Sequence, residues 1–210
     1  MTQSSISPRR AAQQKRSREK VEKILATTLS LLTDRPADQV NTNLIAEQAG
    51  VSVGTLYQFF PNKEAIFHAL FQRWLAITLE VLDKVQAQLP EDASREDCVD
   101  VFLEALTEPT LNSKENWKLR WAMGTSPKLA ELEAEHKGDV LRRIVALQQR
   151  FGDGPPPEFG QELMLLQNEL ILACLYSLSL CEASQNRDQM LSLCKKLVLL
   201  IFDFPRWSAL

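Results

Sequence analysis

Residues 41–60 hold the side chains in this sequence that are best suited to bind a polyanion. The segment reads NTNLIAEQAGVSVGTLYQFF, and its second half carries Thr55, Tyr57 and Gln58 within four positions. Hydroxyl groups can donate hydrogen bonds to phosphate, and a glutamine amide can pair with a base edge, most naturally adenine. Lys63 begins the next expected helix and is placed for a further phosphate contact. The segment therefore predicts a surface that binds nucleic acid.

The spacing of small and apolar residues in the same segment predicts two short helices joined by a tight turn. Ala46 is small where a second helix must approach, and Gly50, four residues later, can take the left-handed conformation that ends a helix. Ser52 is a suitable cap for the second helix, with its side chain accepting from a backbone N–H near Thr55. Leu56, six residues after Gly50, points back into the core. This pattern is typical of a helix-turn-helix.

The rest of the chain predicts helices that position this unit. Apolar residues recur at steps of three and four, and no alternating strand pattern occurs, so we expect an all-α fold with at least nine helices. One helix starts near residue 15 and ends before Pro36, and a linking helix covers 63–89. The expected helices of the rear half are 94–108, 113–123, 127–151 (which Gly138 could divide), 160–184 and 187–204.

Charge is distributed unevenly along the chain. Residues 1–75 carry 10 Lys and Arg against 6 Asp and Glu, a net charge of +4, whereas residues 76–210 carry 14 against 21, a net charge of −7. A polyanion would therefore meet the front of the molecule. The apolar content of 45% and charged content of 24% exclude a wholly disordered chain.

The run IAEQAGVSVGTLYQFFPNKE, residues 45–64, resembles the DNA-binding signature of the TetR family of bacterial transcriptional regulators. The resemblance covers about residues 16–75. It implies an N-terminal three-helix DNA-binding domain joined by a long helix to a C-terminal helical domain that binds a small effector and dimerises. It also implies a homodimer on a near-palindromic double-stranded operator, with repression as the family default and release by the effector. The expected division is a disordered basic arm, 1–14, a DNA-binding domain, 15–62, and an effector-binding and dimerisation domain, 63–210.

The resemblance also implies roles for individual residues. Asn41 and Thr42 would lie at the start of the first motif helix, against phosphate, and one of them would cap it. The DNA-binding set is Asn41, Thr42, Asn43, Ser52, Val53, Gly54, Thr55, Tyr57, Gln58 and Lys63. For the basic arm two interpretations stay open: contact with DNA, or a solvated tail.

Two further sets of residues in the rear half are candidates for a pocket and an interface. The candidate pocket residues are Phe102, Trp117, Trp121, Met123, Asn168 and Leu172, for which core packing is the alternative. Their apolar and aromatic character is the reason to expect an apolar or aromatic effector. The last two helices are apolar on more than one face, which predicts a four-helix dimer interface. Its candidate residues are Leu163, Leu170, Leu178, Leu193 and Leu197.

Several classes of function lack support in the sequence. His68 and His136 are isolated from the cysteines, and phosphate-cradling glycine loops and H-E-x-x-H are missing, so we expect no enzyme, metal or cofactor. The longest unbroken apolar run, residues 170–176, has seven residues against the ~20 that span a membrane, and residues 1–20 lack a signal-peptide core. The four cysteines form no C-x-x-C pair, which indicates reduced, buried thiols in a cytoplasmic protein.

Three alternatives to a ligand-responsive regulator remain open from the sequence. An all-α enzyme would need clustered acids, bases or metal ligands. A helical adaptor that binds only protein would have no need of Tyr57 and Lys63 as phosphate-facing side chains. A DNA-binding protein without a ligand would lack a cavity in its rear domain.

Overall fold

The fold is all-α throughout the part of the chain that the structure describes. The computed structural model describes residues 9–151, 160–181 and 185–202, and within these ranges it contains nine helices and no strand. Their bounds are α1 Arg9–Asp34, α2 Thr42–Gln48, α3 Val53–Phe59, α4 Lys63–Gln88, α5 Arg95–Leu106, α6 Lys114–Met123, α7 Pro127–Gln149, α8 Gly160–Leu180 and α9 Gln185–Phe202.

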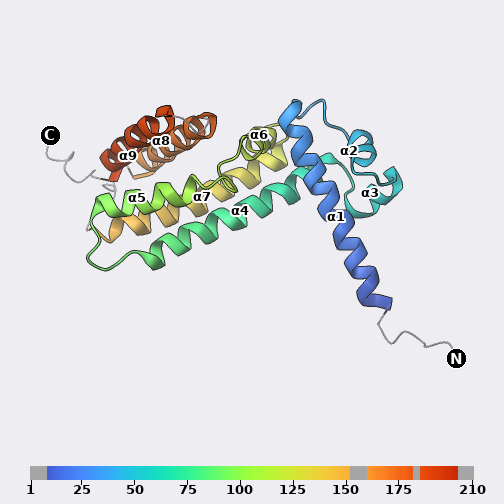
Figure 1. Ribbon diagram of the computed structural model, residues 1–210, viewed down its shortest axis with the longest axis horizontal. Coiled ribbons are helices and arrows are strands. Elements are labelled where there is room, and N and C mark those ends of the chain that lie inside the picture. Colours follow the sequence, from blue (N-terminus) through green and yellow to red (C-terminus); the bar gives the residue numbers. More distant parts are fainter. Residues whose placement is uncertain (1–8, 152–159, 182–184, 203–210) are drawn as a thin grey trace.

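The helices form two groups at opposite ends of an elongated molecule (Figure 1). At one end α1 packs on α2, and α2 packs on α3. From there α4 runs the length of the molecule beside α5 and α7, and α8 and α9 pair at the far end (Figure 1). The helix α6 lies between the groups and contacts both α1 and α4.

Side-chain caps explain where several of these helices begin. Asn62, Ser94, Ser113 and Ser126 each accept a hydrogen bond from the backbone N–H three residues later. Such a cap satisfies one of the N–H groups that a helix start leaves unpaired. At α5 the cap is reciprocal, because Asp97 also accepts from the backbone N–H of Ser94.

Two hydrophobic clusters form the core, and three helices, α4, α6 and α7, contribute to both. The cluster at the α1–α3 end contains Phe67 and Phe71 of α4, whereas the cluster at the far end contains Leu82 and Val85 of the same helix. The helix α6 is divided in the same way: Leu119, Ala122 and Met123 belong to the first cluster and Trp117 to the second. A displacement of α4 or α6 is therefore felt in both cores.

The expected helices of the rear half are all present, with ends that differ from the prediction by at most four residues. Gly138 does not divide α7. Residues 9–14 were expected to belong to a disordered arm, but they form the first turns of α1, where alanine and glutamine favour helix. Residues 1–8 of that arm lie outside the described residues.

Candidate nucleic-acid interface and internal cavity

The helices α2 and α3 form a helix-turn-helix with a glycine turn. Asn41 Oδ1 accepts from the Leu44 N–H at 3.0 Å, and Ser52 Oγ accepts from the Thr55 N–H at 3.1 Å, so Asn41, not Thr42, caps α2. Gly50 has φ of +61°, which is the conformation predicted for the turn. The two helix starts are thus fixed by their own side chains.

One side of this unit is buried against the rest of the first cluster. Ile45 and Leu56 are fully buried, and Ala46 is 1% exposed. The Val51 N–H donates to the Ala46 carbonyl at 3.0 Å across the turn. This packing determines which side of α3 faces outward.

The outward side of α3 carries small, polar and aromatic residues. Ser52, Val53, Gly54 and Gln58 are exposed, as are Asn41 and Asn43 near the start of α2. Tyr57 is 50% exposed, although a large aromatic side chain usually buries most of its surface. Its hydroxyl lies 3.0 Å from Oγ1 of Thr42, so this bond joins the outward surfaces of α2 and α3.

Thr55 and Gly54 differ in their contacts within the protein. Thr55 is half-buried, and its hydroxyl lies 2.8 Å from Ser52 Oγ, so it supports the start of α3 as well as reaching the surface. Gly54 has no comparable contact: a Cβ placed there would meet only Ser52 Oγ, at 4.0 Å. Nothing among the described residues therefore requires glycine at this helical position.

Lys63 has an intramolecular role that the sequence did not indicate. Its Nζ donates to the carbonyl oxygens of Ala37 and Val40, at 3.0 and 3.2 Å. The ammonium group is half-buried and ties the start of α4 to the segment between α1 and α2. We therefore assign Lys63 first to holding this segment, because two of its three N–H donors are already used there.

A two-bond ion pair joins α1 to α4 on the outside of the same end. Arg73 donates from Nη1 and Nη2 to the two carboxylate oxygens of Glu22. These bonds hold the pKa of the Glu22 carboxyl below its ordinary value. Both groups are exposed, so the pair orients α1 more than it stabilises the fold.

A cavity of about 50 Å³ lies between α4, α5, α6, α7 and α8. It is lined by four of the candidate pocket residues, Phe102, Trp117, Asn168 and Leu172, which the fold brings together from three helices. Other apolar lining comes from Trp74 and Leu82 of α4 and from Ile171 and Leu175 of α8.

The remaining two candidate pocket residues lie elsewhere. Met123 is completely buried in the first cluster, because it is on the side of α6 that faces the helix-turn-helix end. Trp121 is 55% exposed, and its ring lies 5.2 Å from that of Tyr176. It borders a separate open cleft between α6 and the end of α1.

Polar residues of the cavity wall were missed by the sequence reasoning. Arg120, His136 and Lys137 all line it. Burial lowers the pKa of His136 to about 4, with Arg120 as the next cause, so its imidazole is neutral at pH 7. In the sequence these three residues appear only as charged or polar positions within helical patterns. Such positions do not indicate that a side chain faces inward.

Exposed leucines gather on α8 and α9. Of the 11 large hydrophobic residues that are exposed among the described residues, seven lie on these two helices: Leu165, Leu166, Leu170, Leu180, Leu193, Leu197 and Leu200. Six of them, all but Leu165, follow one stripe on each helix by their spacing. Leu163 is half-buried. Leu178 was expected at the interface, but it is fully buried in the second cluster, so it cannot meet a partner.

The cysteines and acidic residues form no reactive centre in the described ranges. Cys98, Cys174 and Cys194 are buried free thiols, and Cys181, expected to be buried, is half-exposed. Burial raises the pKa of Cys98 to about 11, which keeps it protonated at neutral pH. No group of three His, Cys, Asp or Glu residues within those ranges is placed to hold a metal ion.

Two helices, α4 and part of α8, are long and apolar enough by composition to cross a membrane. In this fold the apolar side of α4 lies in both core clusters, and α8 packs on α9. Packing inside the protein therefore accounts for the apolar side of α4, whereas α8 also keeps exposed leucines.

Comparisons with known proteins point to one family. A sequence model described as bacterial regulatory proteins of the tetR family matches residues 24–70, which include α2 and α3. The transcriptional regulator EthR of Mycobacterium tuberculosis is 32% identical over 113 residues, which are 52% of this chain and 50% of EthR. The match thus spans about half the length of this relative.

Solved structures agree with the fold over most of the chain. A tetR-family regulatory protein from Rhodococcus RHA1 has a TM-score of 0.65 at 16% identity, covering 88% of this chain and 95% of that one. SmeT in complex with triclosan has a TM-score of 0.64 at 16% identity, covering 88% and 90%. With the helix-turn-helix geometry, these findings show that residues 24–70 match the helix-turn-helix region of bacterial regulatory proteins of the tetR family, within a fold that resembles these solved structures.

Proposed function

We propose that the protein is a cytoplasmic transcriptional regulator that binds a near-palindromic DNA operator as a homodimer and is released by a small apolar or aromatic effector. Repression is the proposed direction of control. The observation that carries the proposal is the outward surface of α2 and α3, where no contact requires glycine at Gly54 and where the ring of Tyr57 stays half-exposed although its hydroxyl bonds to Thr42. Contact with a DNA duplex accounts for both, through close approach of the backbone and a hydroxyl facing phosphate.

The leucine stripes of α8 and α9 support dimerisation. A monomer rarely leaves a contiguous set of large apolar side chains in water. Two copies of the α8–α9 pair would bury these stripes as a four-helix interface, and the symmetry of that dimer would present two copies of α3. To read successive major grooves, the two copies must lie ~34–36 Å apart.

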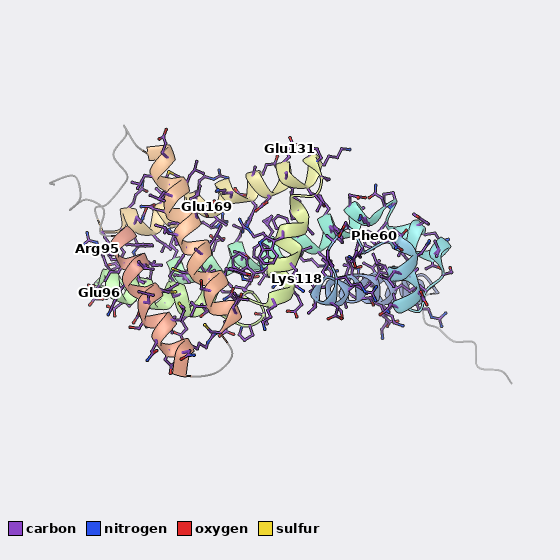
Figure 2. The ribbon with its side chains drawn as sticks, turned by 90° about the horizontal axis from the view of Figure 1, so that it is seen from above. Phe60, Arg95, Glu96, Lys118, Glu131 and Glu169 are labelled. Atoms are coloured by element: carbon purple, nitrogen blue, oxygen red, sulfur yellow. The ribbon has the colours of Figure 1, made fainter. Side chains whose placement is uncertain are left out.

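The cavity supports the effector part of the proposal, and its size suggests how a signal would arise. At about 50 Å³ it is far smaller than the ~300–1,000 Å³ of typical ligand pockets. A bound effector must therefore move a wall. The wall helix α6 is tied to α1: Lys118 Nζ donates to the Thr33 carbonyl, and Figure 2 shows Lys118 on α6 next to the α1–α3 end.

This tie supports α6 as a route to the DNA-binding surface alongside α4, which also borders the cavity and packs in the cluster at the α1–α3 end. Thr33 Oγ1 also donates to Glu115 of α6, at 3.4 Å. An effector that binds better when α6 is displaced would favour the state with altered spacing of the two α3 helices. Without such a difference in affinity no effector could change DNA binding.

The test is selection of bound fragments from random double-stranded DNA with the full-length protein. We expect a near-palindromic site, and we expect Tyr57→Ala to weaken binding to it at least tenfold at fixed salt. The control is Ile77→Ala, because Ile77 is a comparably exposed apolar residue on α4, at 45%. Equal binding by wild type and Tyr57→Ala, or failure to select any site, would contradict the proposal.

A further inference from the structure

Two buried polar atoms of the cavity wall lack a hydrogen-bond partner within the described residues. They are Nδ1 of His136 on α7 and Nδ2 of Asn168 on α8. The two residues are only 3% and 4% exposed, and both line the cavity. The Glu169 carboxyl, whose pKa is lowered first by Lys137 and to a smaller extent by the Asn168 amide, is near Nδ2 but not in hydrogen-bond geometry with it. A buried donor or acceptor without a partner destabilises the fold, so such atoms are usually paired by water or a ligand.

Two other polar residues of the wall, Asn112 and Thr78, are already hydrogen-bonded within the protein. Asn112 accepts from Trp117 Nε1 at 2.7 Å and donates to the Leu175 carbonyl at 2.9 Å. The Thr78 hydroxyl donates to the Trp74 carbonyl at 2.9 Å. These groups are engaged within the protein and do not call for a ligand.

Donors dominate the rest of the wall. Two cationic residues, Arg120 and Lys137, line the cavity together with Asn168. Each cation has a carboxylate partner, Glu133 for Arg120 at 3.0 Å and Glu169 for Lys137, but neither carboxylate lines the cavity. Figure 2 marks Glu169 on α8. Of each ion pair, the residue that lines the cavity is therefore the cationic one.

The state of His136 agrees with this polarity. Its pKa falls to about 4, first through burial and then through the positive charge of Arg120. A second positive charge in the cavity would add to this repulsion, whereas a negative charge would be attracted. A neutral imidazole also carries one N–H group that can donate a hydrogen bond to an oxygen of the ligand.

We propose that the cavity takes a small organic acid, with an apolar ring between Trp74, Trp117 and the α8 side chains and a carboxylate that accepts from Asn168 and Arg120. This inference rests on the proposed effector function and adds the chemical class of the effector. It predicts that carboxylates bind more tightly than amines or neutral molecules of the same shape. The small cavity volume favours a single ring.

The test compares benzoate, benzamide and benzylamine as probes of the full-length protein, with binding followed by calorimetry and by the fluorescence of the cavity tryptophans. We expect benzoate to bind at least tenfold more tightly than the other two. Asn168→Leu should weaken benzoate binding at least fivefold, while Gln72→Leu, which removes an exposed amide on α4, should not change it.

A second measurement needs no ligand. Asn168→Leu removes an unpartnered buried donor while keeping a similar volume, so its urea unfolding midpoint should equal or exceed that of the wild type. A lower midpoint would mean that the amide has a structural partner, and it would overturn the inference.

The remaining outcomes separate this inference from the proposed function. Equal or tighter binding of benzylamine or benzamide would overturn the acid class but leave an effector cavity. Failure of all three probes to bind would overturn the inference, while the operator selection would still report on DNA binding. If the wild-type protein selects no operator, the proposed function is refuted, regardless of which probes bind.

Discussion

Gly54 provides a test in which folding stability and DNA binding should change in opposite directions. The residue is the second of α3, it is exposed, and a Cβ there would meet only Ser52 Oγ at 4.0 Å. In Gly54→Ala the added methyl group therefore has room. Because alanine loses less conformational entropy than glycine in a helix, the free energy of unfolding should rise, by up to about 1 kcal/mol.

The same methyl group would stand between α3 and the DNA. If it prevents one hydrogen bond to a phosphate, the loss is about 1.5–3 kcal/mol. Since 1.4 kcal/mol corresponds to tenfold in affinity, operator binding should weaken by about ten- to a hundredfold. Urea unfolding measures the first quantity, and fluorescence anisotropy with a selected DNA fragment at fixed salt measures the second.

A second helical glycine supplies the matched control. Gly138 lies within α7, and a Cβ there would meet the flexible end of Arg142 at 3.5 Å, an ordinary contact. Gly138→Ala should also raise the free energy of unfolding but leave operator affinity unchanged. If Gly54→Ala binds the operator as tightly as the wild type, α3 does not approach DNA closely at this residue and our explanation of the glycine is wrong.

Three further substitutions test the glycine turn, the buried histidine and the leucine stripes. Gly50→Ala places a side chain at φ of +61° and should lower the free energy of unfolding by about 1–2 kcal/mol in urea, with Gly50→Asn closer to wild type. Burial lowers the pKa of His136 to about 4, so at pH 5 only the unfolded chain gains its proton, and the protein should be about 2 kcal/mol less stable at pH 5 than at pH 7. The variant His136→Gln should show a smaller loss of stability between pH 7 and pH 5. An equal loss in the variant and the wild type would refute this assignment. Leu193→Glu should yield a monomer in micromolar sedimentation, whereas Leu165→Glu, outside the stripe, should not; equal dimerisation of both variants would exclude this interface.

Local sequence rules were sufficient for the helix-turn-helix. The capping of α3 by Ser52, the left-handed Gly50 and the buried Leu56 all follow from interactions within a few residues, and the structure confirms them. The same holds for the breaks at proline and for the number of helices in the described ranges. Short-range sterics and hydrogen bonds decide these features before the chain packs.

The sequence did not determine which side of a helix faces which neighbour. Met123 and Trp117 lie six residues apart on α6, yet one packs at the α1–α3 end and the other borders the cavity. Leu178 and Leu170 belong to the same apolar helix, but only Leu170 remains exposed. A helix that is apolar on several sides does not indicate from its sequence which side packs inside.

The sequence by itself determined an all-α chain with a helix-turn-helix whose capping and turn are encoded within 20 residues. Tertiary structure decided that Lys63 holds two carbonyl oxygens, that α6 joins both cores, and that Arg120, His136 and Asn168 meet at one cavity. The physical reason is range: caps and turns act between close neighbours in the chain, whereas a cavity wall is assembled from helices that are distant in sequence and meet only when the apolar surface is buried.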